Sequence, residues 1–293
     1  MSVATAPIAE RTGTNETAGA RRIHRSFAAA RRAGRVALIP YVVAGYPDAA
    51  TSLRIATAAI DAGADLLEVG LPYSDPLADG ATLQRASQVA LAAGATLEGS
   101  LRLIEQVAAA RPGTAIVPMG YANQFVGGGD GREAARRLSD AGAAGVIVAD
   151  LTPDEGGPFE AVARDHELAV VYLVAPTTAP TRRAAIAARS GGFLYCVSLV
   201  GVTGARASLP STVGRLVREV TTASPVPVAV GFGVSKPGHI RAISRAGADG
   251  VIVASALVDA LGGDGVDVAA MERLVRELAA ATGSRPSTER SPG

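Results

Sequence analysis

The strongest constraint on the fold is a short pattern that the sequence repeats three times. In each copy a helix-like apolar pattern stops at a glycine, and a run of leucine or β-branched residues follows at once. A glycine stop suits the left-handed end of a helix, and a continuous apolar run is typical of a strand buried on both faces of a parallel sheet. The repeated unit is therefore helix, glycine, buried strand. The copies are Asp61–Gly70, Asp140–Asp150 and Arg245–Ser255, with their glycines at Gly63, Gly142 and Gly247.

Five further segments have the composition of buried strands, and helical patterns such as Asp48–Ala62 lie between them. The segments are Val36–Val43, Ile116–Met119, Ala169–Val174, Phe193–Ser198 and Val226–Val230. Eight alternating strand and helix signals predict the α/β class and, within it, a (β/α)8 TIM barrel; an open doubly wound sheet of eight strands is the alternative. A length of 293 residues fits one barrel of about 250 residues with extra ends.

The two ends of the chain lie outside this predicted barrel. An amphipathic pattern over Arg21–Ala33, with Ile23 and Phe27 on one side, predicts an extra N-terminal helix that caps the barrel. We therefore expect a single catalytic domain over residues 21–283, with a disordered arm over residues 1–20 and a disordered polar tail over residues 284–293.

Composition excludes several classes of protein. The formal net charge is +1, too balanced for binding nucleic acid through bulk charge, and the one cysteine, Cys196, excludes an internal disulfide framework. The longest uncharged stretch, Pro112–Gly129, contains two amide side chains and five glycines, so we expect no membrane span. The first twenty residues lack the apolar core of a secretory signal, which predicts a cytoplasmic protein.

Glu68 is the first candidate catalytic residue. It lies five residues after the glycine of its repeat, where the other two copies carry Ile147 and Ile252. A carboxyl group among apolar side chains is costly to bury, and such surroundings raise its pKa into the range of a general acid or base. The alternative is a core glutamate paired with an arginine, although no arginine lies nearby in the sequence.

The acidic loop, Gly70–Gly80 (GLPYSDPLADG), follows this strand directly and carries Asp75 and Asp79. The active sites of (β/α)8 barrels lie where the strands end and such loops begin. Glu68 and Asp79 are therefore a candidate pair of acids with two different roles. Either aspartate alone would also fit a solvated turn that caps the next helix.

Three loops at consecutive strand ends, two of them rich in glycine and the third opening a helix, predict a phosphate-binding site. Backbone N–H groups in such loops approach phosphate oxygens closely, and a helix N-terminus adds its dipole. The loops are Gly201–Ala205, Gly231–Ser235 and Val253–Val258, and in the last of them Ala254 and Ser255 begin a helix.

Counting residues removes two mechanisms. A Schiff-base aldolase needs a lysine inside the barrel, but the only lysine, Lys236, lies beyond a glycine loop and next to Pro237. The three histidines, His24, His166 and His239, are too far apart in the expected fold to meet around a metal ion, and neither a Rossmann nor a Walker motif is present. We therefore expect no metal and no other cofactor, and acid/base chemistry on a phosphorylated substrate.

Five motifs between about Arg21 and Ala281 resemble the tryptophan synthase alpha chain family. They are Leu67–Gly80, Gly45–Asp48, Met119–Phe125, Val197–Ala205 and Val230–Ser235, and the first is the most specific. The resemblance implies a (β/α)8 barrel and the retro-aldol cleavage of indole-3-glycerol phosphate to indole and glyceraldehyde 3-phosphate, in tryptophan biosynthesis. It also implies a partner, the β subunit of an α2β2 complex, to which indole passes through a tunnel.

The resemblance further implies a role for each matching residue. Glu68 would protonate C3 of the indole and handle the proton of the side-chain hydroxyl. Asp79 would hold the indole N–H and stabilise the positive charge on the ring, and Asp75 would face the β subunit. The residues implied around the substrate are Tyr41, Tyr121, Tyr195, Phe232 and Thr203, the last on a loop that closes over the site, and those implied at the phosphate are Gly204, Gly233, Ala254 and Ser255. For Tyr41 and Phe232, ordinary core packing remains open.

Three positions depart from the family pattern. Ala81 follows Gly80 where the family usually has proline, Thr152–Pro153 replaces a pair of prolines, and Ala254 stands where glycine is usual. The first two bear on partner affinity more than on catalysis, and we expect phosphate binding to persist at Ala254 if its φ is negative. Two alternatives to a synthase subunit remain: a free-standing lyase that releases indole, and a non-catalytic barrel that only binds or activates a partner.

Overall fold

Short runs of valine, leucine, isoleucine and alanine form the central sheet. The computed structural model describes residues 16–197, 211–231 and 233–283, and in this part of the chain nine parallel strands follow the spatial order β5-β4-β3-β2-β1-β9-β8-β7-β6. The strands are β1 (Ala37–Val43), β2 (Leu66–Gly70), β3 (Ala115–Gly120), β4 (Gly145–Val148), β5 (Ala169–Val171), β6 (Leu173–Val174), β7 (Leu194–Val197), β8 (Val228–Gly231) and β9 (Gly250–Val253).

The sheet closes into a barrel at Tyr172. This one residue separates β5, which pairs with β4, from β6, which pairs with β7. Its backbone continues the connection, because its carbonyl accepts a hydrogen bond from the N–H of Tyr195 (3.0 Å) and its N–H donates to Oγ of Ser190 (3.0 Å). The predicted strand Ala169–Val174 is therefore split in two, and the predicted (β/α)8 barrel is confirmed.

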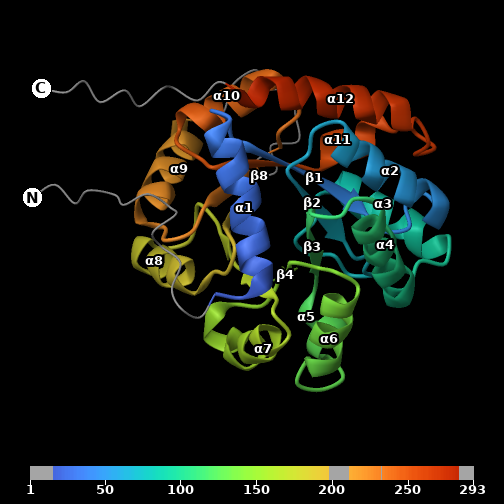
Figure 1. Ribbon diagram of the computed structural model, residues 1–293, viewed down its shortest axis with the longest axis horizontal. Coiled ribbons are helices and arrows are strands. Elements are labelled where there is room, and N and C mark those ends of the chain that lie inside the picture. Colours follow the sequence, from blue (N-terminus) through green and yellow to red (C-terminus); the bar gives the residue numbers. More distant parts are fainter. Residues whose placement is uncertain (1–15, 198–210, 232, 284–293) are drawn as a thin grey trace, which may run out of the picture.

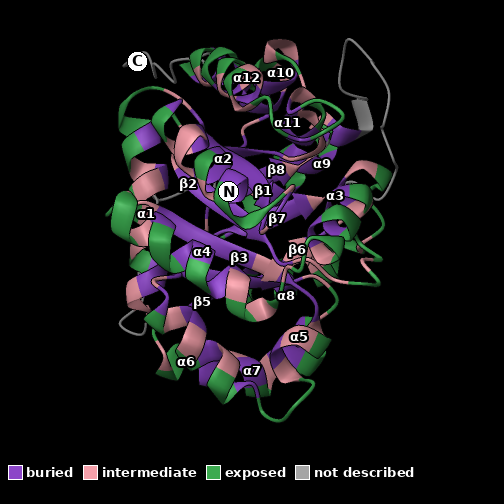
Figure 2. Ribbon diagram, turned by 90° about the vertical axis from the view of Figure 1, so that its right-hand side faces the viewer, coloured by how far each residue is buried: buried purple, intermediate pink, exposed green. Residues whose placement is uncertain are grey.

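Helices surround the strands on all sides (Figure 1). They are α2 (Ala49–Asp61), α3 (Ala81–Ala92), α4 (Leu97–Ala110), α5 (Ala122–Val126), α6 (Arg132–Asp140), α7 (Pro153–Asp165), α8 (Pro180–Arg189), α9 (Ser211–Ala223), α10 (Pro237–Arg245), α11 (Ser255–Ala260), α12 (Val268–Ala280) and a 3-10 turn (Ala281–Gly283). The three repeat glycines adopt left-handed φ angles of 114°, 90° and 95°, as their place after a helix predicts. Figure 2 shows the consequence: the strands are buried, and the helices expose only their outer faces.

Helix α1 (Ala18–Arg32) crosses the end of the barrel at which the strands begin. We call this the lower end; in Figure 1 it is the end covered by α1, in front of the strands. Ile23 and Phe27 are buried there among the inward-facing side chains of the strands, and the rings of Phe27 and Phe193 lie 5.8 Å apart. The predicted capping helix is confirmed. It begins at Ala18, after a Thr17 cap, so its first three residues come from the segment that we assigned to a disordered arm.

Carboxylates and arginines fix the lower end. Asp65 accepts two hydrogen bonds from Arg35 (2.5 and 2.7 Å) and one from the backbone N–H of Leu38 (2.9 Å). Asp249 accepts in the same manner from Arg31 (3.2 Å) and from the backbone N–H of Val228 (3.1 Å). Since Arg31 belongs to α1, the second pair ties the capping helix to the strands.

Among the residues that the structure describes, none of the helices combines the length and the hydropathy that a membrane span requires.

Candidate active site

Glu68 is the middle residue of β2 and lies between Tyr41 on β1 and Val117 on β3 in the strand register. Two residues further on, β2 ends at the upper end of the barrel, which is the end where the strands finish. Its side chain is 1% exposed, and neither carboxyl oxygen has a hydrogen-bond partner within the described residues. Burial, and to a lesser extent the negative charge of Asp79, raises the pKa of Glu68 to about 8. The carboxyl group is therefore protonated at neutral pH and can donate its proton.

Asp79 lies at the end of the acidic loop and is half-buried. Its backbone is fixed on both sides, because its N–H donates to the carbonyl of Pro76 (3.0 Å) and its carbonyl accepts from Nε2 of Gln84 (2.9 Å). Burial raises the pKa of Asp79 to about 6, and hydrogen bonding from Tyr121 opposes that rise. At pH 7 the site thus holds one protonated and one ionised carboxyl group, which are the two forms that paired acid/base chemistry needs.

Two buried tyrosines border this pair. Burial and the negative charges of Asp79 and Glu68 raise the pKa values of Tyr41 and Tyr195, so both hydroxyls stay protonated. Glycines at the strand ends make room for the two rings. A Cβ at Gly70 would lie 1.9 Å from the hydroxyl of Tyr41, and one at Gly231 would lie 2.8 Å from the ring and hydroxyl of Tyr195.

Tyr121 forms a third wall at the end of β3. Its ring stacks on Tyr73 of the acidic loop, with centroids 5.1 Å apart, and Nδ2 of Asn123 donates to the hydroxyl of Tyr73 (3.3 Å). The sequence interpretation did not assign a role to Tyr73. The only sequence feature that pointed to Tyr73 was its place beside Pro72, just after a strand. That it stacks on Tyr121 is visible only in the structure.

The structure describes part of the predicted phosphate site. Gly233 has a φ of +58°, a conformation that favours glycine, and Ala254 caps α11 with a φ of −123°. The φ of Ala254 is therefore negative, the condition under which we expected its methyl group to be compatible with phosphate binding. Thr203, Gly204 and Phe232, which the sequence also indicated, lie outside the described residues.

The outer part of the acidic loop faces solvent. Asp75 is exposed, and Leu77 is 82% exposed, which makes it one of the few large apolar side chains on the surface. Two of the departures from the family pattern begin helices: Ala81 is the first residue of α3, and Thr152 caps α7 ahead of Pro153. Leu77 carried a sequence signal that we did not use, an apolar residue between two aspartates.

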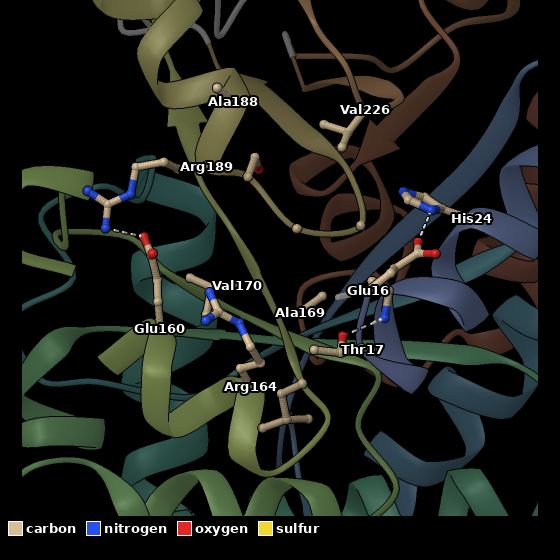
Figure 3. A pocket seen from close by; sticks show the side chains of 15 residues that line it. Glu16, Thr17, His24, Glu160, Arg164, Ala169, Val170, Ala188, Arg189 and Val226 are labelled. Carbon is tan, nitrogen blue, oxygen red and sulfur yellow. Dashed lines mark hydrogen bonds and ion pairs between the residues drawn. The ribbon is translucent and has the colours of Figure 1, made fainter. Parts of the chain in front are cut away.

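A hollow of about 320 Å³ lies at the lower end beside the start of α1 (Figure 3). Four of its side chains form two contacts: Arg189 contacts Glu160 (2.8 Å), and His24 contacts Glu16. The three histidines do not meet in the fold. Among the described residues, no three histidine, cysteine, aspartate or glutamate side chains gather closely enough to hold a metal ion. The unpaired carboxyl group therefore distinguishes the upper end.

A (β/α)8 barrel that buries a carboxyl group in β2 and carries a second acid in the loop after that strand is typical of an acid/base enzyme. The comparison with protein families is more specific: residues 27–283 match the model of the tryptophan synthase alpha chain. The chain belongs to this family.

Individual relatives agree with that assignment. The alpha chain of Roseiflexus castenholzii is 47% identical over 240 residues, which is 82% of this chain and 91% of the relative. That of Methanothermobacter thermautotrophicus is 44% identical over 252 residues, 85% of this chain and 92% of the relative. Among solved structures, tryptophan synthase of Mycobacterium tuberculosis superposes with a TM-score of 0.82 at 40% identity, covering 89% of this chain and 98% of that one.

Proposed function

We propose that this chain is a carbon–carbon lyase that cleaves indole-3-glycerol phosphate to indole and glyceraldehyde 3-phosphate, as the alpha subunit of tryptophan synthase in tryptophan biosynthesis. The observation that carries the proposal is Glu68, a carboxyl group buried in the middle of β2 without a hydrogen-bond partner in the described residues. An isolated acid in this position is costly to the fold, and a reaction that needs a proton donor explains its presence. Family membership supplies the substrate.

The proposed mechanism uses the two carboxyl groups in turn. Protonated Glu68 gives its proton to C3 of the indole, and the ring becomes a cation whose positive charge lies largely on nitrogen. Ionised Asp79 accepts a hydrogen bond from the indole N–H and stabilises that cation. The Glu68 carboxylate then takes the proton of the neighbouring side-chain hydroxyl. The C–C bond breaks, its electron pair returns to the ring, and an aldehyde and neutral indole result with Glu68 protonated again.

The remaining site residues bind the two ends of the substrate. Tyr41, Tyr121 and Tyr195 form aromatic walls that suit a flat bicyclic ring. The proposed role of Phe232 beside them rests on the family motif alone. Backbone N–H groups at Gly233, Ala254 and Ser255 are the proposed phosphate ligands among the described residues. The proposed roles of Gly204 at the phosphate and of Thr203 at the substrate rest on the family motif alone. The three described tyrosines are buried beside the carboxyl pair, which supports the first part of this assignment.

The exposed part of the acidic loop is the proposed contact with the β subunit of an α2β2 complex. Asp75 and Leu77 project from the same loop that ends at Asp79, so a partner bound to them would act directly on the catalytic aspartate. We propose a cytoplasmic location, in keeping with a biosynthetic enzyme.

The direct test is release of indole from indole-3-glycerol phosphate by the purified chain, with and without an added tryptophan synthase β subunit. We expect measurable release alone and a large increase with the partner. Strong release that the β subunit does not change would favour the free-standing lyase, and no release under either condition would favour the non-catalytic barrel. EDTA and borohydride should leave the rate unchanged, and inhibition by either would reinstate a metal or an imine.

A further inference from the structure

One turn of the chain holds the acidic loop at both of its ends. This turn, Tyr121–Gln124, follows β3 and begins α5. The hydroxyl of Tyr121 accepts a hydrogen bond from the backbone N–H of Ala78 (3.0 Å), next to Asp79. Nε2 of Gln124 donates to the carbonyl of Pro72 (3.1 Å), where the loop leaves β2. The two contacts come from neighbouring side chains, so they fix the loop relative to β3.

The hydrogen-bonding capacity of a phenol fits the position of Tyr121. A tyrosine hydroxyl accepts from one group and donates its single proton to another. Since the N–H of Ala78 occupies an acceptor position, the proton is left for the carboxyl group of Asp79, whose pKa hydrogen bonding by Tyr121 lowers. The stack of Tyr121 on Tyr73 restricts the ring from its other side.

Gln124 connects Tyr121 to the start of the acidic loop. Its Oε1 accepts from the backbone N–H of Tyr121 (3.0 Å) while its Nε2 holds Pro72, so one side chain links the tyrosine to the start of the loop. Gly120 makes this fold of the side chain feasible, because a Cβ there would lie 2.7 Å from Oε1 of Gln124.

We propose that Tyr121 and Gln124 are positioning residues for Asp79: together they fix both ends of the acidic loop and orient the aspartate toward the substrate. This inference rests on the proposed function, since it presumes that Asp79 stabilises charge on the indole. It assigns Tyr121 a role through its hydroxyl, beyond that of an aromatic wall, and it gives Gln124 a role that the sequence did not indicate.

The surroundings of Asp79 determine what loss of the hydroxyl does. The ionisable groups that face it in the described part of the chain are Glu68 on β2, Tyr41 on β1, Tyr195 on β7 and Tyr121 itself. None of them is a cation. Without the Tyr121 proton, the ionised form of Asp79 therefore loses a hydrogen bond that nothing else on these elements replaces, and its pKa rises.

The first test is Tyr121→Phe, which keeps the ring and its stack. We expect kcat to fall about tenfold or more with a smaller change in KM, because the lost interaction strengthens as charge develops in the transition state. The acid limb of the pH profile of kcat/KM should move up by roughly one pH unit, the effect expected for one charge-assisted hydrogen bond. An acid limb that stays at its wild-type position in a folded Tyr121→Phe protein overturns the proposal.

Tyr172→Phe is the matched control. It removes the same atom from another buried tyrosine that donates to a carboxylate, Glu160, outside the barrel. It should leave kcat, KM and the pH profile unchanged. A shift of the acid limb in this variant equal to that of Tyr121→Phe would show a general effect of losing a buried hydroxyl, and would also overturn the proposal.

The second test is Gln124→Leu, compared with Gln88→Leu at an exposed position of α3. We expect a severalfold loss of kcat for the first variant only. Asp79→Asn separates the two levels of the argument. If Asp79→Asn keeps near-normal turnover, the proposed function itself fails. If it is inactive while Tyr121→Phe and Gln124→Leu retain wild-type kcat and pH profiles, only the positioning role is wrong.

Discussion

Buried carboxyl groups at the two ends of the barrel have opposite surroundings. At the lower end, Asp65 and Asp249 each accept hydrogen bonds from an arginine and from the N–H of a strand residue. At the upper end, Glu68 has apolar and aromatic neighbours and a second acid, and no partner in the described residues. All of these residues carry a carboxyl group. They differ in whether the fold supplies hydrogen-bond partners for its oxygens.

This difference separates structural from chemical acids without any knowledge of a substrate. A carboxylate with a fixed cation and a backbone donor holds elements together, and its removal leaves buried donors unsatisfied. A carboxyl group that the fold leaves unsatisfied contributes nothing to stability and is available to react. Glu68→Gln, Asp65→Ala and the pH dependence of the rate test the two halves of this comparison. Ala81→Pro tests the acidic loop.

The largest effect is expected for Glu68→Gln. The amide keeps the shape of the side chain but neither donates a proton to carbon nor takes one from a hydroxyl, so indole release should fall by about 10²–10⁴-fold or more. Indole formation measured under single-turnover conditions gives the rate. The melting temperature should stay within a few degrees of the wild type. Near-normal turnover in this variant would refute the catalytic assignment.

Asp65→Ala should lower stability and leave catalysis unchanged, the reverse of the outcome for Glu68→Gln. Loss of the two-point contact with Arg35 and of the bond to Leu38 should lower the free energy of unfolding by about 2–4 kcal/mol, with kcat per folded molecule unchanged. Denaturant unfolding measures the first quantity and titration of active sites the second. Asp75→Ala, at an exposed carboxylate of the acidic loop, is the stability control and should be neutral. Equal stability of the two variants would remove the distinction between the ends.

The pH dependence reports the two acids of the upper end directly. Asp79 must be ionised and Glu68 protonated, so kcat/KM should rise as pH increases through about 6 and fall as pH increases through about 8. Beyond each limb the rate should change about tenfold per pH unit. A profile flat between pH 5 and 9 would contradict the assignment of either acid, and in Glu68→Gln the residual rate should lack the alkaline limb.

The smallest effect is expected for Ala81→Pro, which restores the residue usual in the family. Proline suits the first position of a helix, and Gly80 has an extended backbone (φ −74°, ψ 163°) compatible with a following proline. We expect a gain of about 0.4–1 kcal/mol in stability, through a smaller entropy of the unfolded chain. Thermal unfolding measures it, and a loss of stability would mean that the acidic loop needs its present freedom.

The sequence was sufficient for the fold because the barrel repeats one local rule. Continuous apolar runs, glycine stops and amphipathic helices each follow from short stretches of chain, and the structure confirms the eight predicted strand positions. Glu68 was found by the same logic, as an exception to the pattern of its sister strands at Ile147 and Ile252.

What the sequence did not indicate depends on contacts between distant segments. The stack of Tyr73 on Tyr121 and the bond from Gln124 to Pro72 join residues about fifty positions apart, and no local pattern encodes them. The division of the predicted strand at Tyr172 follows from closure of the ring, because the residue changes neighbours there. The start of α1 at Ala18 depends on a cap at Thr17 within a stretch whose composition favours disorder.

The capping helix α1 determines by which end of the barrel substrate enters and product leaves. Ile23 and Phe27 are packed against the inward-facing side chains of the strands, so the lower end of the barrel is closed. A product formed beside Glu68 therefore leaves by the upper end, the same end by which the substrate enters. For the described part of the chain, a partner that captures a small apolar product before it reaches water is therefore expected to dock at the upper end and not over α1.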